Sequence, residues 1–163
     1  MAPKSRLEQI RNIGFVAHID AGKTTVTERV LFFAGRIYKI GGVDEGTTAM
    51  DWRAQERGRG ITITSASTTC RWKGYTINVI DTPGHADFSG EVERIMNMAD
   101  GCLLLVDAVD GPMPQTTYVL KTALSQNVTP MVVINNTDRA EARVADVVDL
   151  VQASFVEWAI FLL

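Results

Sequence analysis

Short apolar runs alternate along the chain with longer segments whose apolar residues recur at helical spacing. The short runs are rich in β-branched residues and are bounded by turn-forming residues, as is typical of strands. The predicted strands are 12–17, 61–72, 75–81, 102–106 and 131–134, and the predicted helices are 23–34, 90–99, 112–125 and 142–155. This alternation favours βαβ units, and therefore an α/β fold with a mostly parallel sheet and helices on both faces.

Local signals add detail to this scheme. Lys73 and Gly74 separate two predicted strands, which favours a hairpin and makes one strand of the sheet antiparallel. Gly35 is a natural stop for the first helix. The polar segment 36–60 has no steady period, and a loop of this length is typical of a functional segment. Four valines share one face of the last predicted helix: Val144, Val147, Val148 and Val151.

Composition limits the class of protein. The chain has 163 residues, 46% hydrophobic and 21% charged, which suits one globular domain. Its net charge of -3 argues against a general nucleic-acid-binding surface and against DNA binding, but a net charge does not report how basic residues are arranged. Cys70 and Cys102 are predicted to be buried free thiols of a reducing compartment. The N-terminus has no secretory signal, and no apolar run is long enough to span a membrane.

The most specific motif is the segment 17–24, which reads Ala-His-Ile-Asp-Ala-Gly-Lys-Thr between a predicted strand and a predicted helix. It is a phosphate-loop pattern with alanine in place of the first glycine. Successive N–H groups can cradle phosphate, Lys23 adds a positive charge, and the Thr24 hydroxyl is a ligand for Mg²⁺. The residues expected around the phosphates are His18, Ile19, Asp20, Ala21, Gly22, Lys23, Thr24 and Thr25. The alternative is a glycine turn followed by a chance Lys-Thr pair.

A second motif, Asp-Thr-Pro-Gly-His at 81–85, follows a predicted strand. Asp81 is then expected at the carboxyl end of that strand, on the same sheet edge as the phosphate loop. A carboxylate there can hold Mg²⁺ through water, and the N–H of Gly84 can meet a γ-phosphate. The alternative is an ordinary turn at the end of a strand, because these residues are also good turn formers.

Two further segments complete the set. Asn135 and Asp138 follow a predicted buried strand, and an aspartate can accept from the N1–H and the exocyclic amine of guanine. An Asx-type turn alone also explains them. Thr62 ends the long loop, where it either ligates Mg²⁺ or simply starts a strand as a β-branched residue. The order of these parts predicts a P-loop NTPase G domain over 1–163, with switch I at about 36–62 and switch II at about 81–90.

With these motifs placed, the chain resembles the translational GTPases over nearly its whole length. From Arg11 to about Asp81 it is similar to elongation factor G, through the segments 11–14, 17–24, 43–48 and 55–57. From about Asp81 onward it is similar to the ribosome-associated GTPase BipA, also called TypA, through 84–88, 107–116 and 132–135. A chimera, a designed sequence and a divergent natural one are all compatible with this pattern.

The resemblance implies binding of GTP or GDP with Mg²⁺, and GTP hydrolysis coupled to the ribosome, in the cytoplasm or an organellar matrix. Lys23 and Thr24 would hold phosphate and Mg²⁺. Thr62 would be the metal ligand from switch I, and Asp81 and Gly84 would be the contacts from switch II. In this family the γ-phosphate orders switch I, so the same is expected here.

The resemblance also implies the catalytic residue. His85 matches the residue that positions the attacking water once the ribosome orders it. Ile19 and Ile61 resemble the apolar pair that gates this histidine, and Asp20 would help to hold a monovalent cation near the phosphates.

The chain departs from the family pattern in two places. Asn136 replaces the lysine of the base-reading motif, whose stem packs over the base. A Ser-Ala loop that would meet guanine O6 does not appear after Asp138, so the G domain is interpreted as truncated at its C-terminus. Together these changes are expected to cost about 1–3 kcal/mol of guanine binding. The domain would therefore be either a GTPase, a nucleotide-binding module with little turnover, or a fragment without nucleotide function.

Truncation has a structural consequence as well. The strand 131–134 would be a bare apolar edge, which is a route to self-association. The apolar tail 158–163 is expected either to fold back over this exposed sheet or to form an oligomer contact.

Overall fold

The computed structural model describes residues 7–39, 66–82 and 89–161. Much of the predicted switch I, with Ile61 and Thr62, and residues 83–88 of switch II, with Gly84 and His85, lie outside these ranges. The described elements are η1 (Leu7–Gln9), β1 (Ile10–Ala17), α1 (Lys23–Phe33), β2 (Ala66–Trp72), β3 (Tyr75–Asp81), α3 (Ser89–Met96), β4 (Gly101–Asp107), α4 (Pro114–Ser125), β5 (Thr129–Asn135) and α5 (Val144–Phe161).

The described strands form one five-stranded sheet in the order β2-β3-β1-β4-β5. β1 pairs in parallel with β3 and β4, and β4 pairs in parallel with β5. Only the pairing of β2 with β3 is antiparallel among the described strands, and Lys73 and Gly74 make its turn with positive φ angles of 47° and 84°. The predicted fold class, a mostly parallel α/β sheet with one antiparallel strand, is confirmed.

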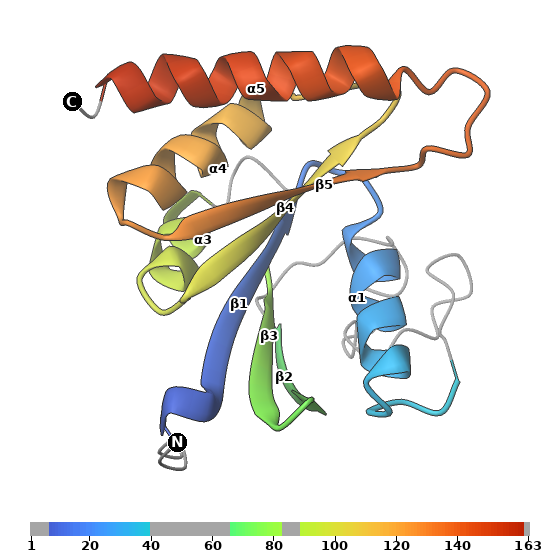
Figure 1. Cartoon of the computed structure of the whole chain (residues 1–163), viewed down its shortest axis with the longest axis vertical. Helices are drawn as coiled ribbons and strands as arrows, with labels where there is room; N and C mark the ends of the chain where they lie inside the picture. The colour runs from blue at the N-terminus through green and yellow to red at the C-terminus, as the bar shows by residue number, and fades with distance from the viewer. Residues whose placement is uncertain (1–6, 40–65, 83–88, 162–163) are drawn as a thin grey trace.

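Helices cover both faces of the sheet (Figure 1). On one face α1 packs over β1 and β3 through a cluster that includes Phe15, Leu31 and Val79. On the other face α3, α4 and α5 enclose a larger cluster that includes Leu104 and Leu120. Both cysteines are buried and free, as predicted. No described helix has the length and apolar character needed to cross a membrane.

The helix α4 begins later than predicted. It starts at Pro114 rather than Pro112, because Gly111 takes a φ of 76° and forms an isolated bridge with Asp107. Pro114 then occupies the first turn, where a missing N–H costs least.

The buried face of α5 is narrower than the predicted valine stripe. Val147 and Val151, one helical turn apart, are buried, whereas Val144 and Val148 are 38% and 45% exposed. Because α5 packs on α4 and β5 along one narrow line, only the residues at that line lose their contact with solvent. The four valines therefore share one face of the helix, as predicted, but only Val147 and Val151 are buried.

β5 lies at the edge of the described sheet, as predicted, and its Met131 is 64% exposed. The backbone of the apolar tail continues α5 as helix as far as Phe161 (Figure 1). An oligomer contact through this edge or tail stays a prediction.

Candidate functional site

The loop between β1 and α1 folds as a tight turn around the predicted phosphate site. The N–H of Ala21 donates to the carbonyl of His18 at 3.2 Å, and Asp20 and Gly22 take positive φ angles of 63° and 82°. A Cβ built on Gly22 would collide with Nδ2 of Asn135. Position 22 therefore needs glycine for two reasons, its left-handed backbone and the close approach of another strand end.

Lys23 and Asp81 meet beside this turn. The Nζ of Lys23 lies 2.5 Å from Oδ1 of Asp81, and the two side chains are only 7% and 0% exposed. The parallel register of β1 and β3, which pairs Phe15 with Asp81, brings the carboxylate to the loop. Thr82 fixes the end of β3 by donating from its N–H and hydroxyl to the carbonyl of Phe15. The buried ammonium of Lys23 and the buried carboxylate of Asp81 thus form an ion pair at the start of α1.

Asn135 ties the predicted base-reading segment to the phosphate loop. It ends β5, and its Nδ2 donates to the carbonyl of Ala21 at 2.9 Å. Its own carbonyl accepts from the N–H of Ala108, at the end of the neighbouring strand β4. The predicted guanine and phosphate residues are thereby held on one edge of the sheet.

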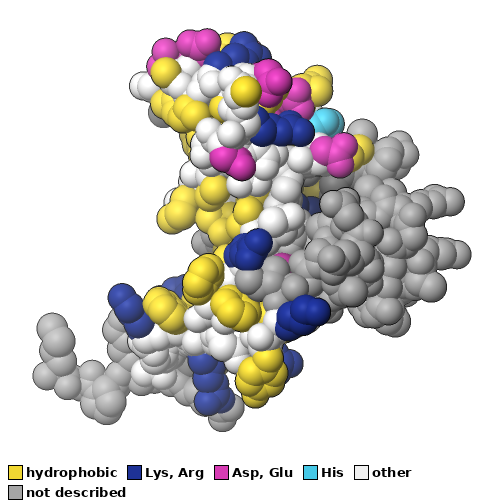
Figure 2. Space-filling view, turned by 90° about the vertical axis from the view of Figure 1, so that its right-hand side faces the viewer, with side chains coloured by type: hydrophobic (Ala, Val, Ile, Leu, Met, Phe, Trp, Pro, Cys, Tyr) yellow, Lys and Arg dark blue, Asp and Glu magenta, His cyan; other side chains and the backbone are white. Residues whose placement is uncertain are grey.

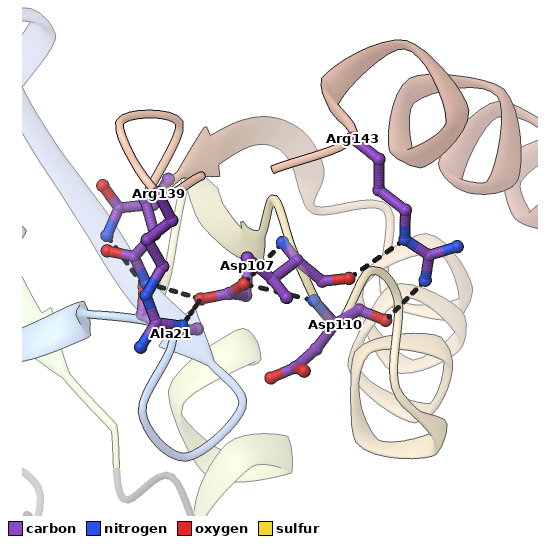
Figure 3. A network of polar contacts seen from close by, with 8 residues as sticks. Ala21, Asp107, Asp110, Arg139 and Arg143 are labelled. Atoms are coloured by element: carbon purple, nitrogen blue, oxygen red, sulfur yellow. Dashed lines mark hydrogen bonds and ion pairs between the residues drawn. The ribbon is translucent and has the colours of Figure 1, made fainter. Parts of the chain in front are cut away.

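Asn136, the residue that departs from the family pattern, belongs to the polar network around Asp107, and Figure 3 shows this network. It has a φ of 58°, and its Nδ2 donates to Oδ2 of Asp107 at 2.5 Å. The other carboxylate oxygen of Asp107 accepts from the N–H groups of Val109 and Asp110 at 2.7 and 3.2 Å. The guanidinium of Arg139 lies 3.8 Å from Oδ2.

These contacts lower the pKa of Asp107. Burial by itself raises the pKa of this carboxyl, but hydrogen bonds from Asn136, Val109 and Asp110 and the charge of Arg139 lower it by more. The ionised carboxylate therefore anchors the turn after β4 and the turn after β5 to each other.

Arg143 supports the same turn from the other side (Figure 3). Its Nε donates to the carbonyl of Val109 at 3.0 Å and its Nη2 to the carbonyl of Asp110 at 3.4 Å. The sequence interpretation did not single out Asp107 or Arg143 as site residues. The available signal was an aspartate at the end of a buried strand, the same position that Asp81 occupies on β3.

The remaining predicted residues are placed unevenly. Thr24 is buried at the start of α1 and Thr25 is exposed. His18 and Ile19 are half-buried, and Nδ1 of His18 lies 3.3 Å from Oε1 of Gln115. Asp138 is exposed on the turn after β5, where its carboxylate is open to a ligand. The structure thus brings Gly22, Lys23, Asp81 and Asn135 together, while Thr62, Gly84 and His85 lie outside the described residues.

The residues present fit a magnesium-bound phosphate. Lys23 offers a positive charge, and Thr24 and Asp81 offer the hard oxygen atoms that Mg²⁺ prefers. Within 7–39, 66–82 and 89–161 no group of three His, Cys, Asp or Glu side chains could hold a metal ion. Mg²⁺ is usually held by one or two protein oxygen ligands together with substrate phosphate and water, and Thr24 and Asp81 would fit that pattern.

Comparisons with known proteins agree with this geometry. Residues 8–161 match the family described as "Elongation factor Tu GTP binding domain". The chain is 51% identical over 152 residues to Elongation factor G 2 of Syntrophomonas wolfei. This alignment covers 93% of this chain and 22% of that protein. A crystal structure of a protein from Thermus thermophilus superposes with a TM-score of 0.84 at 27% identity, covering 90% of this chain and 22% of that chain.

The likeness to elongation factor G extends across both halves of the chain, because the match covers 93% of it. The predicted likeness of the second half to BipA is not shown by these comparisons. The chain spans about a fifth of the length of each of these two matched proteins.

Proposed function

The chain belongs to the elongation factor Tu GTP binding domain family, and from this premise we propose that it binds GTP and GDP with Mg²⁺ and hydrolyses GTP as part of a translation factor. Membership supports a GTP-binding domain of the translation-factor class. The residue roles, the turnover of this chain and its work on the ribosome are the proposal.

One observation carries the proposal: the Lys23–Asp81 pair lies beside the Gly22 turn, and Asn135 holds that turn from β5. Three sequence motifs far apart in the chain converge on one edge of the sheet. A chance glycine turn with a neighbouring Lys-Thr pair would not require Asp81 and Asn135 at the same place.

Each residue has a proposed task. The N–H groups of 18–25 and the ammonium of Lys23 bind the phosphates, and Thr24, Asp81 and Thr62 supply the oxygen ligands of the metal. Bound Mg²⁺ would neutralise charge on the β- and γ-phosphates. Asn135 positions the loop, and Asp138 accepts from the guanine edge.

For hydrolysis, His85 would position the attacking water. Ile19 and Ile61 would gate the side chain of His85, and the N–H of Gly84 would donate to the γ-phosphate. The water adds to the γ-phosphorus, the bond to the β–γ bridging oxygen breaks, and GDP and phosphate leave. These assignments rest on the sequence resemblance, since His85, Gly84 and Ile61 lie outside the described residues.

Titration calorimetry with GDP and then ADP, each with Mg²⁺, tests nucleotide binding. The expected result is clear binding of GDP and much weaker binding of ADP. Equal affinity for both would mean that only the phosphate loop works and that Asp138 does not read the base. If neither GDP nor ADP binds, the proposed function is refuted.

A second candidate is a nucleotide-binding module with little turnover. It is favoured by Asn136, whose amide is engaged by Asp107 where the family has a lysine that packs over the base. Single-turnover hydrolysis of radiolabelled GTP, measured with and without ribosomes, separates the two candidates. Stimulation by ribosomes supports the GTPase, and release of unchanged GTP supports the module.

Three lesser assignments complete the proposal. Asp20, an exposed residue of the phosphate loop, would help to hold a monovalent cation. GDP affinity should then be higher in potassium than in a bulky organic cation at equal ionic strength. Work on the ribosome would place the chain in the cytoplasm or in an organellar matrix. Self-association through β5 or the end of α5 is testable by analytical ultracentrifugation.

A further inference from the structure

A groove lies at the end of the sheet opposite to the candidate nucleotide site. It has a volume of about 390 Å³ and is formed by the β2–β3 hairpin together with Gln9 of η1. β1 and β3 run in parallel, and their carboxyl ends carry the phosphate loop and Asp81. The groove lies at their amino ends, roughly 20 Å away along β3 at the usual rise per residue. It is therefore separate from the site already described.

Two aromatic rings stand at this end of the hairpin. Trp72 pairs directly with Tyr75 across the turn, so the two side chains share one face of the sheet. On that face the apolar cluster under α1 reaches Cys70 and Ile77 but does not include the two rings. Trp72 is 53% exposed and Tyr75 is half-buried. The hairpin thus offers aromatic surface that the core does not use.

Cations surround these rings. The guanidinium of Arg11 lies 5.4 Å from the centre of the Tyr75 ring, and Nζ of Lys73 lies 5.9 Å from the centre of the Trp72 ring. Arg71, which is exposed, and Lys73 line the groove, and Arg11 lies beside it next to Tyr75. Side chains alternate along a strand, so Arg71 and Trp72 point to opposite faces and the groove takes in both faces of the hairpin end.

The charge of this end differs from that of the whole chain. None of the described residues that line the groove is acidic, and the exposed Glu8 lies on the neighbouring η1. Figure 2 shows Lys and Arg side chains among hydrophobic ones at the lower end of the molecule, where Figure 1 places both the hairpin and the end of α1, whereas the upper end carries Lys and Arg together with most of the visible Asp and Glu. The net charge of -3 conceals this local positive patch.

We propose that this groove binds single-stranded RNA. A base stacks on the exposed ring of Trp72, and neighbouring phosphates contact Arg71, Lys73 and Arg11. Aromatic platforms flanked by cations are the usual means by which proteins hold unpaired bases and their backbone. Gln9 and Thr76 line the groove with side chains that can hydrogen-bond a ribose hydroxyl. An acidic peptide would use the cations but leave the rings without a role.

The choice of RNA rather than DNA rests on the proposed function in translation. The proposal that the groove binds a nucleic acid rests only on the residues in and beside the hairpin. The two proposals therefore have separate measurements: a chain that binds RNA but no GDP would refute the proposed function only, and the reverse result would refute the groove only.

Fluorescence anisotropy of a labelled short oligouridine, titrated with the whole chain, tests the groove. Binding should weaken as salt increases, with a slope of about −2 in the double-logarithmic plot for three neutralised phosphates. Polyglutamate of similar length is the competing ligand. It should displace the RNA only at much higher concentration, since it cannot stack on Trp72.

Variants separate stacking from charge. Trp72→Leu should lower RNA affinity about tenfold and leave the salt slope unchanged, whereas Trp72→Phe should keep most of the affinity. Arg71→Gln with Lys73→Gln should reduce the size of the slope by about 1.4. Matched controls are Tyr38→Leu and Arg29→Gln, an exposed aromatic residue and an exposed cation elsewhere, which should bind RNA like the parent.

Thermal melts of each variant show whether it is folded, and the Phe and Gln variants keep the test open if Trp72→Leu unfolds. The proposal is overturned if the parent chain does not bind RNA. It is equally overturned if folded Trp72→Leu binds as the parent does, or if polyglutamate competes as well as unlabelled RNA.

Discussion

The side-chain amide of Asn135 donates a hydrogen bond to the carbonyl oxygen of Ala21, 114 residues earlier in the chain. This contact joins the end of β5 to the phosphate loop across the end of β4, because β4 separates β1 from β5 in the sheet. Asn135 can therefore influence phosphate binding without touching a phosphate.

Replacing Asn135 by alanine should weaken GDP binding. The carbonyl of Ala21 would lose its partner, and loss of such a hydrogen bond costs about 0.5–1.5 kcal/mol. Calorimetry with GDP should show affinity lower by about three- to tenfold. Asn97→Ala is the matched control, an exposed asparagine after α3. Unchanged GDP affinity in Asn135→Ala would mean that the loop holds its shape without β5.

Replacing Gly22 by alanine should damage the same loop more severely. The new Cβ would collide with Asn135, and the φ of 82° is unfavourable for alanine. Backbone strain of this kind costs about 1–3 kcal/mol. GDP binding should be lost and the melting temperature should fall. Gly35→Ala is the control, because Gly35 has a similar φ of 69° but a Cβ there meets nothing within 4 Å, so this variant shows the backbone strain without the collision. A Gly22→Ala chain that binds GDP normally would contradict this account of the loop.

The network around Asp107 should make stability depend on acid pH. The pKa of Asp107 is lower in the folded chain than its ordinary value of 3.8, so the ionised form is favoured by folding. This stabilisation is present above that ordinary value and is lost as the pH falls through the lowered folded pKa. Denaturant unfolding between neutral pH and about pH 3 should show the loss in the parent chain.

Asp107→Asn provides the comparison for that measurement. Asparagine has nearly the shape of aspartate, but it carries no charge and has one accepting oxygen instead of two. The variant should therefore be less stable than the parent at neutral pH by about 1–3 kcal/mol. It should also flatten the loss of stability below about pH 4. Asp110→Asn is the control, since Asp110 is exposed nearby. An identical acid profile for Asp107→Asn and the parent would remove Asp107 from the explanation.

Asn136→Lys should raise the affinity for GDP and lower the folding stability. A lysine would restore the stem that packs over guanine in the family pattern, so GDP should bind severalfold more tightly relative to ADP. The φ of 58° at this position suits asparagine better than lysine, which should cost about 1 kcal/mol of folding stability. Asn136→Ala controls for the lost hydrogen bond to Asp107 alone. If Asn136→Lys binds GDP with the affinity of the parent chain, the side chain at position 136 does not pack against the guanine base.

The predictions that succeeded came from local information. Lys73-Gly74 predicted the hairpin because two residues suffice to set a turn, and the period of apolar residues placed α1 and the strand Tyr75–Asp81. The order of the motifs predicted the GTPase family, because each motif is a short run of residues whose chemistry can be recognised without knowing what lies opposite.

The sequence by itself thus determined the alternation of strands and helices and the family, and it predicted which residues bind phosphate. Tertiary structure alone decided that Asn136 meets Asp107, that Asn135 reaches Ala21, and that cations gather around Trp72 at the far end of the sheet. It also decided that Val148 of α5 stays exposed while Val147 is buried. The reason is that these relationships join residues distant in the chain, and the order and register of the strands, which no local period encodes, bring them together.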